Sequence, residues 1–562
     1  MKVFGTAQVV TQTFKNAGRM RDIVAVFVAH GFADLVHRLR LGKFLPAKYR
    51  VNPDFQQLPI PERLRLAFEK LGPTFVKFGQ LLATRPDLIP DAYVEEFQKL
   101  QDRVATVPFE EIRKQIEAEL GKSLEEAFES IDQAPLAAAS IAQVHSAVLK
   151  TGERVVIKVQ RPGIDKTVSN DISILRGLAV LLERYLPETK LFNPTGMVDE
   201  FFRSIHQELD FHVEANNIRK IRKNLAGMKQ VAIPIVYGSL STTRVLVLER
   251  FEGVRFSDRE AILSNDIKPA EIIETGCDAF FHMVLQDGIF HGDLHAGNLF
   301  VLKDGRIGII DFGIVGRLSK RIKESVTTMF IAIMDEDYES LASEYTYISH
   351  MTGESDLNRL QKDLMDLISP YIGMAIGEVN IGHILMRSTA VAAQHNLRVP
   401  RELMLLFKAI VTIEGLGKKL DPTFDLLSVG NRLAKQALSS RYSKEQILKD
   451  MVVVGRDLQH LAETLPRTTK RFLRKWSQDG FVFETSSKDT ELLANTLKSS
   501  AHVFALSALG VCLFALGTVF LILNHGPFLW GVPIPASAML VVAVTLLMHT
   551  ISVAGKKEKR PQ

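Results

Sequence analysis

The stretch Phe290–Gly316 reads FHGDLHAGNLFVLKDGRIGIIDFGIVG and contains two short runs of β-forming residues, 299–302 and 307–310. An Asp-Gly pair lies between the two runs, and this arrangement predicts a β-hairpin. Asn298 directly precedes the first predicted strand, and Asp311 directly follows the second. Because the strands of a hairpin run in opposite directions, both side chains are expected at its open end, roughly 5 Å apart across the ladder.

The polar residues of this stretch have the spacing of a phosphoryl-transfer site. Asp293 precedes Asn298 by five residues, and an Asp-Phe-Gly triplet begins at Asp311. At this spacing in protein kinases, the first Asp orients the attacking group, and the Asn and the later Asp each bind Mg²⁺. Asp and Asn are also common turn formers, but the combined spacing is more specific than any single motif. His291 and His295 are expected to hold the backbone rather than a metal.

The composition excludes several classes of function. The chain has 562 residues, 24% of them charged, and a formal net charge of +5. Aromatic and basic residues are not interleaved as in proteins that bind single strands, so we expect no nucleic-acid partner. Its two cysteines, Cys277 and Cys512, are too few for a disulfide framework or a Cys-based zinc site. We therefore expect the catalytic part to be cytoplasmic.

Residues 1–50 are expected to form amphipathic helices. Charged residues interrupt this segment before a sufficient apolar core forms, so it does not predict a signal peptide. Its apolar residues recur at helix-like intervals. These helices either pack on the catalytic body or lie on a membrane, and the sequence leaves both possibilities open.

A helix broken near Gly72 is predicted over residues 62–84, and its second part carries Lys77 and Gln80 with Gly79 between them. Residues three apart share a helix face. A glycine beside them would let this face approach another backbone or a ligand closely. From the spacing alone, the favoured interpretation of Lys77 is a surface lysine on a helix whose apolar residues are core.

The segment 135–144 reads PLAAASIAQV and lies where a protein kinase carries its Gly-rich phosphate loop. It contains no glycine, so positive φ angles and close backbone approach are restricted. Any phosphate contact there must have a different geometry. Read alone, an Ala-rich run indicates a helix or a tight core segment.

Two alternating apolar runs, 144–149 and 155–159, predict a second hairpin. Lys158 points to the opposite face from Ile157 and Val159. The kinase pattern Val-Ala-Ile-Lys explains a lysine there, because that lysine reaches the α- and β-phosphates and pairs with a helix glutamate. The alternative is an edge-strand lysine that prevents aggregation.

One helix is predicted over residues 197–223, and it carries Glu208, Asp210 and Glu214. Asp210 and Glu214 are four residues apart, so on a shared face they would repel unless cations lie beside them. Two lysines from other segments would meet this need. The alternative is a solvated acidic face.

Two apolar runs near the C-terminus, 503–523 and 534–553, are each long enough to cross roughly 30 Å of hydrocarbon. The link 524–533 is short and rich in turn residues, so the two segments are expected to form an antiparallel hairpin. Basic residues at 556–560 and 467–475 place both ends on the cytoplasmic side. The alternative is an apolar hairpin buried in a soluble core.

Four of these segments together resemble the motifs of one family. They are Lys77-Phe-Gly-Gln80, the Ala-rich run, the Glu-x-Asp of the acidic helix with the glutamate after it, and His-Gly-Asp-Leu-His-Ala-Gly-Asn. The combination is similar to the UbiB family, atypical protein-kinase-like proteins that support ubiquinone biosynthesis. The resemblance extends from about residue 51 to about residue 420, and the C-terminal hairpin is similar to that of bacterial members.

The resemblance implies roles for the matching residues. Glu214 is implied to pair with Lys158, and Glu208 and Asp210 with Lys77, which joins Asp293 and Lys158 as a catalytic residue. ATP with Mg²⁺ is the implied cofactor. Besides these side chains, the implied nucleotide contacts come from a retuned covering loop and the Lys-x-Gly-Gln motif: Ala137, Ala138, Ala139, Ser140 and Gln80.

The predicted fold class is α+β. We expect a protein-kinase-like two-lobe fold with an N-terminal helical extension, an enlarged helical C-lobe and a C-terminal transmembrane helical hairpin. The predicted segments are the amphipathic helices 1–50, the helical extension 51–130, the N-lobe 131–252, the C-lobe 253–345, the helical C-lobe extension 346–498 and the transmembrane hairpin with its basic tail 499–562.

The predicted function is a membrane-anchored atypical kinase or ATPase at the cytoplasmic face of the cell inner membrane. Its implied partners are the lipid bilayer and quinone precursors or quinone-biosynthesis enzymes. One alternative is a small-molecule or lipid phosphotransferase, because the catalytic loop also resembles that of aminoglycoside and choline kinases. A true protein kinase is disfavoured by the missing Gly-rich loop. The remaining alternative is a non-catalytic scaffold that binds nucleotide or lipid.

Overall fold

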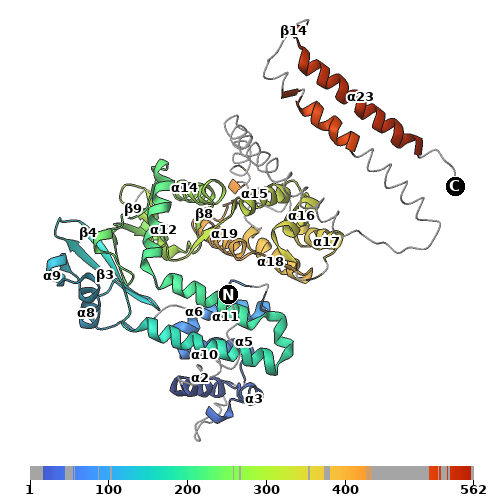
Figure 1. Cartoon of the computed structure of the whole chain (residues 1–562). Coiled ribbons are helices and arrows are strands. Elements are labelled where there is room, and N and C mark those ends of the chain that lie inside the picture. Colours follow the sequence, from blue (N-terminus) through green and yellow to red (C-terminus); the bar gives the residue numbers. More distant parts are fainter. Residues whose placement is uncertain are drawn as a thin grey trace, which may run out of the picture. The chain divides into compact units, whose positions relative to one another are not determined.

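Two compact units, residues 1–448 and 449–562, divide the chain (Figure 1). The structure is a computed structural model, and the residues it describes are 17–44, 55, 57–85, 88–100, 104–256, 258–264, 268–351, 353, 355–371, 380–426, 429–430, 432, 505–516, 518–519, 528–529 and 532–557.

An antiparallel sheet forms the smaller lobe of the first unit (Figure 1). Its strands run in the order β1-β3-β4-β6, and β2 pairs with β3. Alternate residues of β4, from Val155 to Val159, are fully buried, which leaves Lys158 on the other face as predicted. The strands are β1 (Phe128–Ile131), β2 (Ala137–Ala138), β3 (Ala142–Leu149), β4 (Arg154–Gln160) and β6 (Val245–Glu249).

A second sheet has its strands in the order β5-β10-β9-β7. The predicted hairpin is confirmed: β9 and β10 pair antiparallel with Ile309 opposite Leu299, and Gly305 in the turn has φ +82°. A separate pair, β8 with β11, flanks the catalytic loop. These strands are β5 (Val231–Ala232), β7 (Gly253–Arg255), β8 (Ile289–His291), β9 (Leu299–Leu302), β10 (Ile307–Ile309) and β11 (Val315–Arg317).

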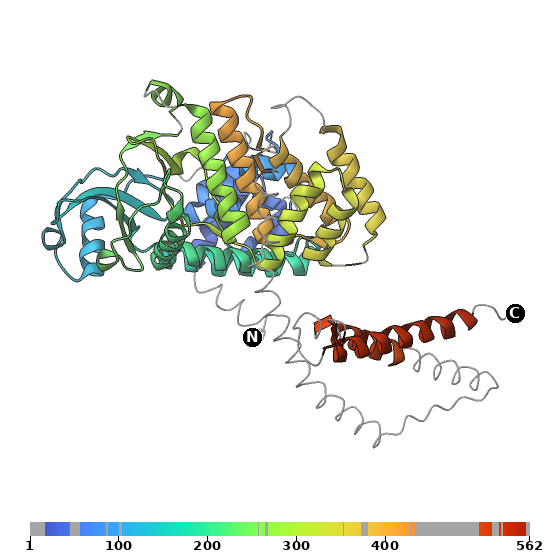
Figure 2. The ribbon, with the colours of Figure 1, turned by 90° about the horizontal axis from the view of Figure 1, so that it is seen from above.

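Helices make up the rest of the larger lobe. Among the helices that the structure describes there, α14 and α19 lie side by side (Figure 2). A π-helical turn, His282–Asp287, continues α14 towards β8. The helices are α13 (Arg259–Ser264), α14 (Pro269–Phe281), α15 (Lys320–Met334), α16 (Tyr338–Ile348), α17 (Leu357–Ile368), α18 (Ile381–Gln394) and α19 (Arg401–Leu420), and the short strands β12 (His350–Met351) and β13 (Leu397–Arg398) pair between them.

The N-terminal extension packs on the catalytic body. In α2 the side chains of Met20, Ile23 and Val24 are buried in the main core, and Arg19 forms a 2.7 Å ion pair with Asp171 of α10. The predicted break is confirmed at Gly72, whose φ of +100° favours glycine. The helices are α2 (Ala17–Ala29), α3 (Ala33–Arg38), α5 (Ile60–Leu71), α6 (Pro73–Leu82), α7 (Asp91–Phe97), α8 (Phe109–Leu120), α9 (Leu124–Ala127) and α10 (Ile164–Tyr185).

The predicted single helix over 197–223 is wrong. The segment forms two helices, α11 (Pro194–Glu208) and α12 (Phe211–Asn224). Asp210 is the N-cap of α12, and its carboxylate accepts a hydrogen bond from the His212 amide at 3.0 Å. A short acidic side chain is a favourable N-cap. The cap starts a new helix at Phe211, although the apolar periodicity of the sequence continues through the segment.

The described part of the second unit is a helical hairpin (Figure 1). Residues 505–516 are helical, and after the paired strands β14 (Phe528–Leu529) and β15 (Val532–Pro533) the helix α23 (Ile534–Lys557) follows. Gly510 lies against Leu547 of α23. Within the described residues, no helix combines the length and the apolarity needed to span a membrane. The predicted span 503–523 and the basic segment 467–475 lie partly or wholly outside those residues, and the transmembrane hairpin stays a prediction.

Candidate phosphoryl-transfer site

The Lys158 ammonium lies between two carboxylates. Its Nζ is 2.9 and 3.0 Å from the two oxygens of Glu214 and 3.5 Å from Oδ1 of Asp311. Burial works against the positive charge, but the charges of Asp311 and Glu214 outweigh it and raise the pKa of Lys158 above its ordinary value. The predicted Lys158–Glu214 pair is therefore present as an ion pair, with side chains only 15% and 5% exposed.

Asp311 closes the open end of the β9–β10 hairpin. Its φ is +60°, and its Oδ1 accepts a hydrogen bond from the Gly313 amide at 3.2 Å. Burial opposes its ionisation, but the positive charge of Lys158, the Gly313 amide and the positive charge of Lys77 lower the pKa of Asp311 to about 2. The carboxylate is therefore ionised at neutral pH.

Asn298 lies at the same end of the hairpin, as predicted. The Ile310 amide donates to its carbonyl oxygen at 2.9 Å. Its side-chain Nδ2 donates to the Asp293 carbonyl at 3.0 Å, so the amide oxygen is the atom that would meet a metal. Mg²⁺ is usually held by one or two carboxylates together with substrate phosphates, and the Asn298 and Asp311 oxygens fit that mode of binding.

Asp293 is held by its loop through His291. The buried His291 ring accepts the Asp293 amide hydrogen at Nδ1, 3.0 Å away, and its Nε2 lies 3.3 Å from the Ile310 carbonyl. Burial lowers the pKa of His291, which favours the neutral ring that these two bonds require. His295 likewise accepts a hydrogen bond from the Gly297 amide at 3.1 Å. Both histidine rings accept hydrogen bonds from backbone amides of the catalytic loop and so hold its backbone, as expected.

Lys408 is a site residue that the sequence analysis missed. Its Nζ lies 3.0 Å from Oδ1 of Asp293. Burial alone would raise the pKa of Asp293, but the Lys408 charge lowers it below its ordinary value. Lys408 lies 115 positions from Asp293 and in no motif. The available signal was a single lysine in the apolar run Leu403–Ile410 of a buried helix.

Lys77 reaches the site from α6. Its Nζ is 3.3 Å from Oε2 of Glu208, at the end of α11, and its charge contributes to the low pKa of Asp311. Asp210, which we also assigned to Lys77, is the N-cap of α12, and its pairing with Lys77 stays a prediction. The helix break separates the acids, so that Glu208 faces Lys77 and Glu214 faces Lys158.

Gly79 and Gln80 face the extension itself. A Cβ atom at Gly79 would lie 2.4 Å from Leu100 and 3.0 Å from Phe68, so this glycine is needed for packing within the extension. We expected Gly79 to allow close approach to another backbone or to a ligand, and the structure shows close approach to neighbouring segments of the chain. The structure places the Gln80 amide 3.2 Å from the Leu100 carbonyl.

The Ala-rich segment is a tight β-turn rather than a helix. Ala138 pairs with Gln143 across β2 and β3, and the Ala139 amide donates to the Ala142 carbonyl at 2.8 Å. Arg161 holds the turn by donating to the Ala139 carbonyl at 3.0 Å. The Ser140 hydroxyl is buried without a hydrogen-bond partner among the described residues. A buried unpaired polar group costs about 1–3 kcal/mol, which a phosphate or other ligand could offset.

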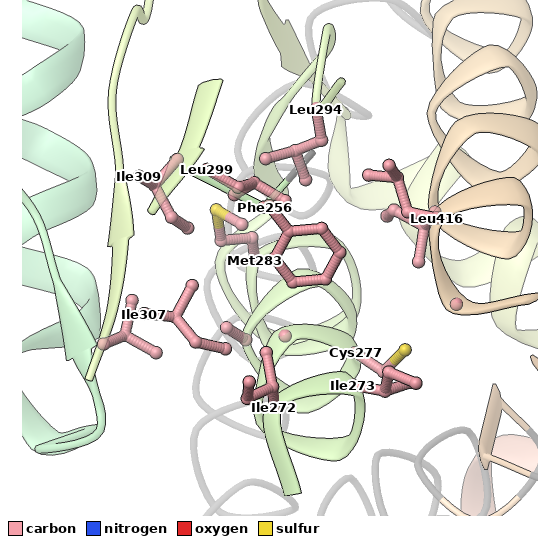
Figure 3. Close-up of a pocket in the computed structure, with 15 residues that line it drawn as sticks. Phe256, Ile272, Ile273, Cys277, Met283, Leu294, Leu299, Ile307, Ile309 and Leu416 are labelled. Carbon is pink, nitrogen blue, oxygen red and sulfur yellow. The ribbon is translucent and has the colours of Figure 1, made fainter. Parts of the chain in front are cut away.

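An apolar cavity lies beneath the catalytic loop, between β9, β10, α14 and α19 (Figure 3). Leu294 and Leu299, on either side of the loop's Asn298, contribute to its wall. Its volume is about 40 Å³, whereas a dry cavity that binds benzene is about 150 Å³. It is therefore too small to receive a quinone ring as it stands.

The two lobes, the Lys158–Glu214 pair and the constellation of Asp293, Asn298 and Asp311 define a protein-kinase-like protein. Residues 99–345 match the ABC1 atypical kinase-like domain, and residues 364–425 match the UbiB helical domain. The chain belongs to the UbiB family.

Curated relatives match most of the chain. The "Probable protein kinase UbiB" of Marinobacter nauticus is 35% identical over 74% of this chain and 79% of the relative. Its namesake in Pseudomonas fluorescens is 32% identical over 94% of this chain and 98% of the relative. A solved complex of Rv3197 with erythromycin from Mycobacterium tuberculosis is 23% identical, with a TM-score of 0.40 over 62% of this chain and 91% of that chain. That structural likeness is too distant to bear on the fold.

Proposed function

We propose that this protein is a membrane-anchored atypical kinase or ATPase that binds Mg²⁺-ATP and supports ubiquinone biosynthesis. The observation that carries the proposal is the contact of Lys158 with both Glu214 and Asp311. In protein kinases the corresponding Lys–Glu pair and the Asp of Asp-Phe-Gly must both be in place for phosphoryl transfer. These two contacts of Lys158 support the proposal.

Each side chain has a role in this proposal. Lys158 binds the α- and β-phosphates, and Asn298 and Asp311 hold Mg²⁺. The metal ion, when bound, offsets phosphate charge. Asp293, whose carboxylate is ionised, orients an attacking hydroxyl or water and accepts its proton. The Ser140 hydroxyl and the turn around it cover the nucleotide.

Water or a small lipid acceptor suits this site better than a protein substrate. Two ion pairs hold the extension against α11: Lys77 of α6 lies 3.3 Å from Glu208, and Arg85, just after α6, lies 2.7 Å from Glu200. Because the Lys77 charge acts on Asp311, the extension lies close to the proposed metal site. We infer that it restricts access by a folded polypeptide.

The link to ubiquinone comes from the family. The relatives carry the name UbiB, and the proposed partners are quinone precursors or the enzymes that process them. The small cavity beneath the catalytic loop does not provide a lipid site. Lipid handling would therefore involve another surface or an opened state.

A membrane anchor is supported by the exposed apolar side chains of the second unit. Water-soluble surfaces rarely expose large contiguous apolar patches, whereas lipid is a suitable solvent for them. We propose that the hairpin spans the inner membrane, with the catalytic unit on the cytoplasmic side. The exposed residues are Leu509, Val511, Phe514, Leu516, Val519, Val541, Val542, Val544 and Met548.

Phosphate release by the purified full-length protein tests the catalytic proposal. We expect Mg²⁺-dependent ATP hydrolysis or transfer, which increases when lipid vesicles are supplied. ATP binding without phosphate release under any of these conditions would favour the non-catalytic scaffold. Deletion of the gene is expected to leave an early, prenylated quinone precursor to accumulate, and unchanged quinone levels would contradict the biosynthetic role.

A further inference from the structure

The catalytic loop lacks the cation that protein kinases place directly before their catalytic aspartate. The kinase motif is His-Arg-Asp, whereas this chain has His291, Gly292 and Asp293. Gly292 provides no side chain to hold the loop from outside. The question is therefore which part of the fold takes over this support.

Helix α19 occupies the space beside Gly292. A Cβ atom built on Gly292 would lie 2.8 Å from Cδ2 of Leu405, closer than real Cβ contacts allow. One turn further along α19, Lys408 places its Nζ 3.0 Å from Oδ1 of Asp293. The absence of a side chain at position 292 thus allows α19 to approach the loop and bring a cation to the carboxylate.

Both ends of α19 are fixed to neighbouring helices. Near its start, Arg401 lies 3.3 Å from Glu200 and donates to the Ser204 hydroxyl at 2.9 Å, and both partners belong to α11. Near its end, the buried Glu414 accepts hydrogen bonds from the amides of Ile381 and Gly382 at 3.1 and 2.8 Å. Lys408 is therefore presented by a fixed helix.

The Lys408–Asp293 pair is not a buried structural ion pair. The two side chains are 34% and 32% exposed, so the pair opens onto solvent. A surface ion pair contributes at most about 1 kcal/mol to stability, and solvent also screens this partly buried pair. The rest of α19 is held by its apolar face. Stability alone does not explain why a lysine stands in this apolar run.

We propose that Lys408 is a positioning residue for phosphoryl transfer. It holds Oδ1 of Asp293, so that the carboxylate keeps the orientation in which it accepts the proton of the attacking hydroxyl or water. The UbiB helical domain, which contains α19, is then part of the catalytic unit. This inference rests on the proposed phosphoryl-transfer function.

Substitutions at Lys408 in the full-length protein test the inference. Lys408→Met should lower kcat at least about tenfold, which is part of the roughly 10²–10⁴-fold that general-base assistance contributes in total. The affinity for Mg²⁺-ATP, measured by direct binding, and the unfolding temperature should stay close to the parent values. Lys408→Arg should retain most of kcat, because it keeps the charge. Lys419→Met, which alters an exposed lysine of the same helix, is the matched control.

A double-mutant cycle with Asp293→Asn separates positioning from a general structural effect. If Lys408 acts through Asp293, the double variant should be no slower than Asp293→Asn alone. Multiplicative losses, or a Lys408→Met variant with parental kcat, would overturn the inference. The inference would also be overturned if Lys408→Gln and Lys408→Met both lost ATP affinity and thermal stability to the same degree as kcat. Absence of phosphate release from the parent protein would instead refute the proposed function itself.

Discussion

Asp311 combines an unusual backbone conformation with a low pKa. A positive φ is uncommon outside glycine, and Asn and Asp tolerate it best. The ionised carboxylate lies 3.5 Å from the Lys158 ammonium, where it can pair with the lysine and bind a metal ion at the same time. Strained positions of this kind tend to occur at functional sites. The charge of the Asp311 carboxylate, rather than its packing, therefore explains why an aspartate occupies this position.

Replacing Asp311 by Asn should remove Mg²⁺-dependent nucleotide binding while leaving the fold intact. Asn is nearly isosteric and tolerates the same backbone conformation, but it removes the charged oxygen that Mg²⁺ prefers. We expect a fall in Mg²⁺-ATP affinity of at least about tenfold, measured by calorimetry, and an unchanged circular dichroism spectrum. Asp304→Asn, at the exposed tip of the same hairpin, is the control. Parental affinity in a folded Asp311→Asn protein would refute the metal assignment.

Residue patterns predicted most of the chemical groups of the site but not their full environment. Asp293, Asn298, Asp311 and Lys158 were found because their spacing follows local strands and turns. Lys408 was missed because its role depends on how α19 packs against the loop, which no local pattern encodes.

At the scale of elements, the break between α11 and α12 decides which lysine meets which glutamate. The apolar periodicity continues through Leu209, so the pattern predicted one helix. The Asp210 cap overrides it, because the side chain satisfies a backbone amide at 3.0 Å and starts a new helix. Glu214 then lies in the first turn of α12, where it faces β4. The two predicted hairpins, in contrast, followed from strong local turn signals.

Substitutions at Asp210 should distinguish a helix cap from an ion-pair partner of Lys77. Asp210→Ala is expected to lower the free energy of unfolding by about 1 kcal/mol and to weaken ATP binding through Glu214. Asp210→Asn should restore both, because Asn caps as well as Asp does. Chemical denaturation and calorimetry measure the two effects. If Asn behaves like Ala, the charge rather than the cap matters, and the ion-pair prediction regains support.

At the scale of the molecule, the second unit tests whether the chain is anchored in lipid. Cys512 is exposed on the helical segment 505–516, so in water its thiol should be open to reagents. Cys277 is buried, and burial raises the pKa of its thiol to about 12, so it should not compete in the native protein. The pair of cysteines therefore provides a natural probe of the hairpin's surroundings.

We expect a membrane-impermeant maleimide to leave Cys512 unlabelled in sealed membranes and to label it after denaturation in detergent. Hydrocarbon around the predicted span 503–523 would exclude the charged reagent. Lys498→Cys lies just before the span and is introduced into a Cys277→Ala background. It should be labelled without detergent when the reagent is on the same side of the membrane as residue 498. Equal labelling rates at the two positions in intact membranes would contradict the spanning hairpin.

The final prediction concerns the extension and Lys77. Its ion pair with Glu208 is largely buried, with side chains 16% and 13% exposed. Together with Arg85–Glu200 it fastens the extension to α11. Breaking a buried pair costs up to about 3–5 kcal/mol, while about 1.4 kcal/mol shifts an open–closed equilibrium tenfold. Loss of Lys77 alone should thus be enough to loosen the extension.

Lys77→Ala should increase hydrogen exchange in α6, alter nucleotide selectivity or expose autophosphorylation, and fail to restore quinone synthesis in a deficient host. The reason is that the extension would no longer restrict the site, and Asp311 would lose a neighbouring positive charge. The control is Lys70→Ala, which alters an exposed lysine of α5. The charge swap Lys77→Glu with Glu208→Lys should restore the ion pair that holds α6 against α11, but not the positive charge beside Asp311. If Lys77→Ala matches the parent in all of these measurements, Lys77 is a surface lysine and the extension does not gate the site.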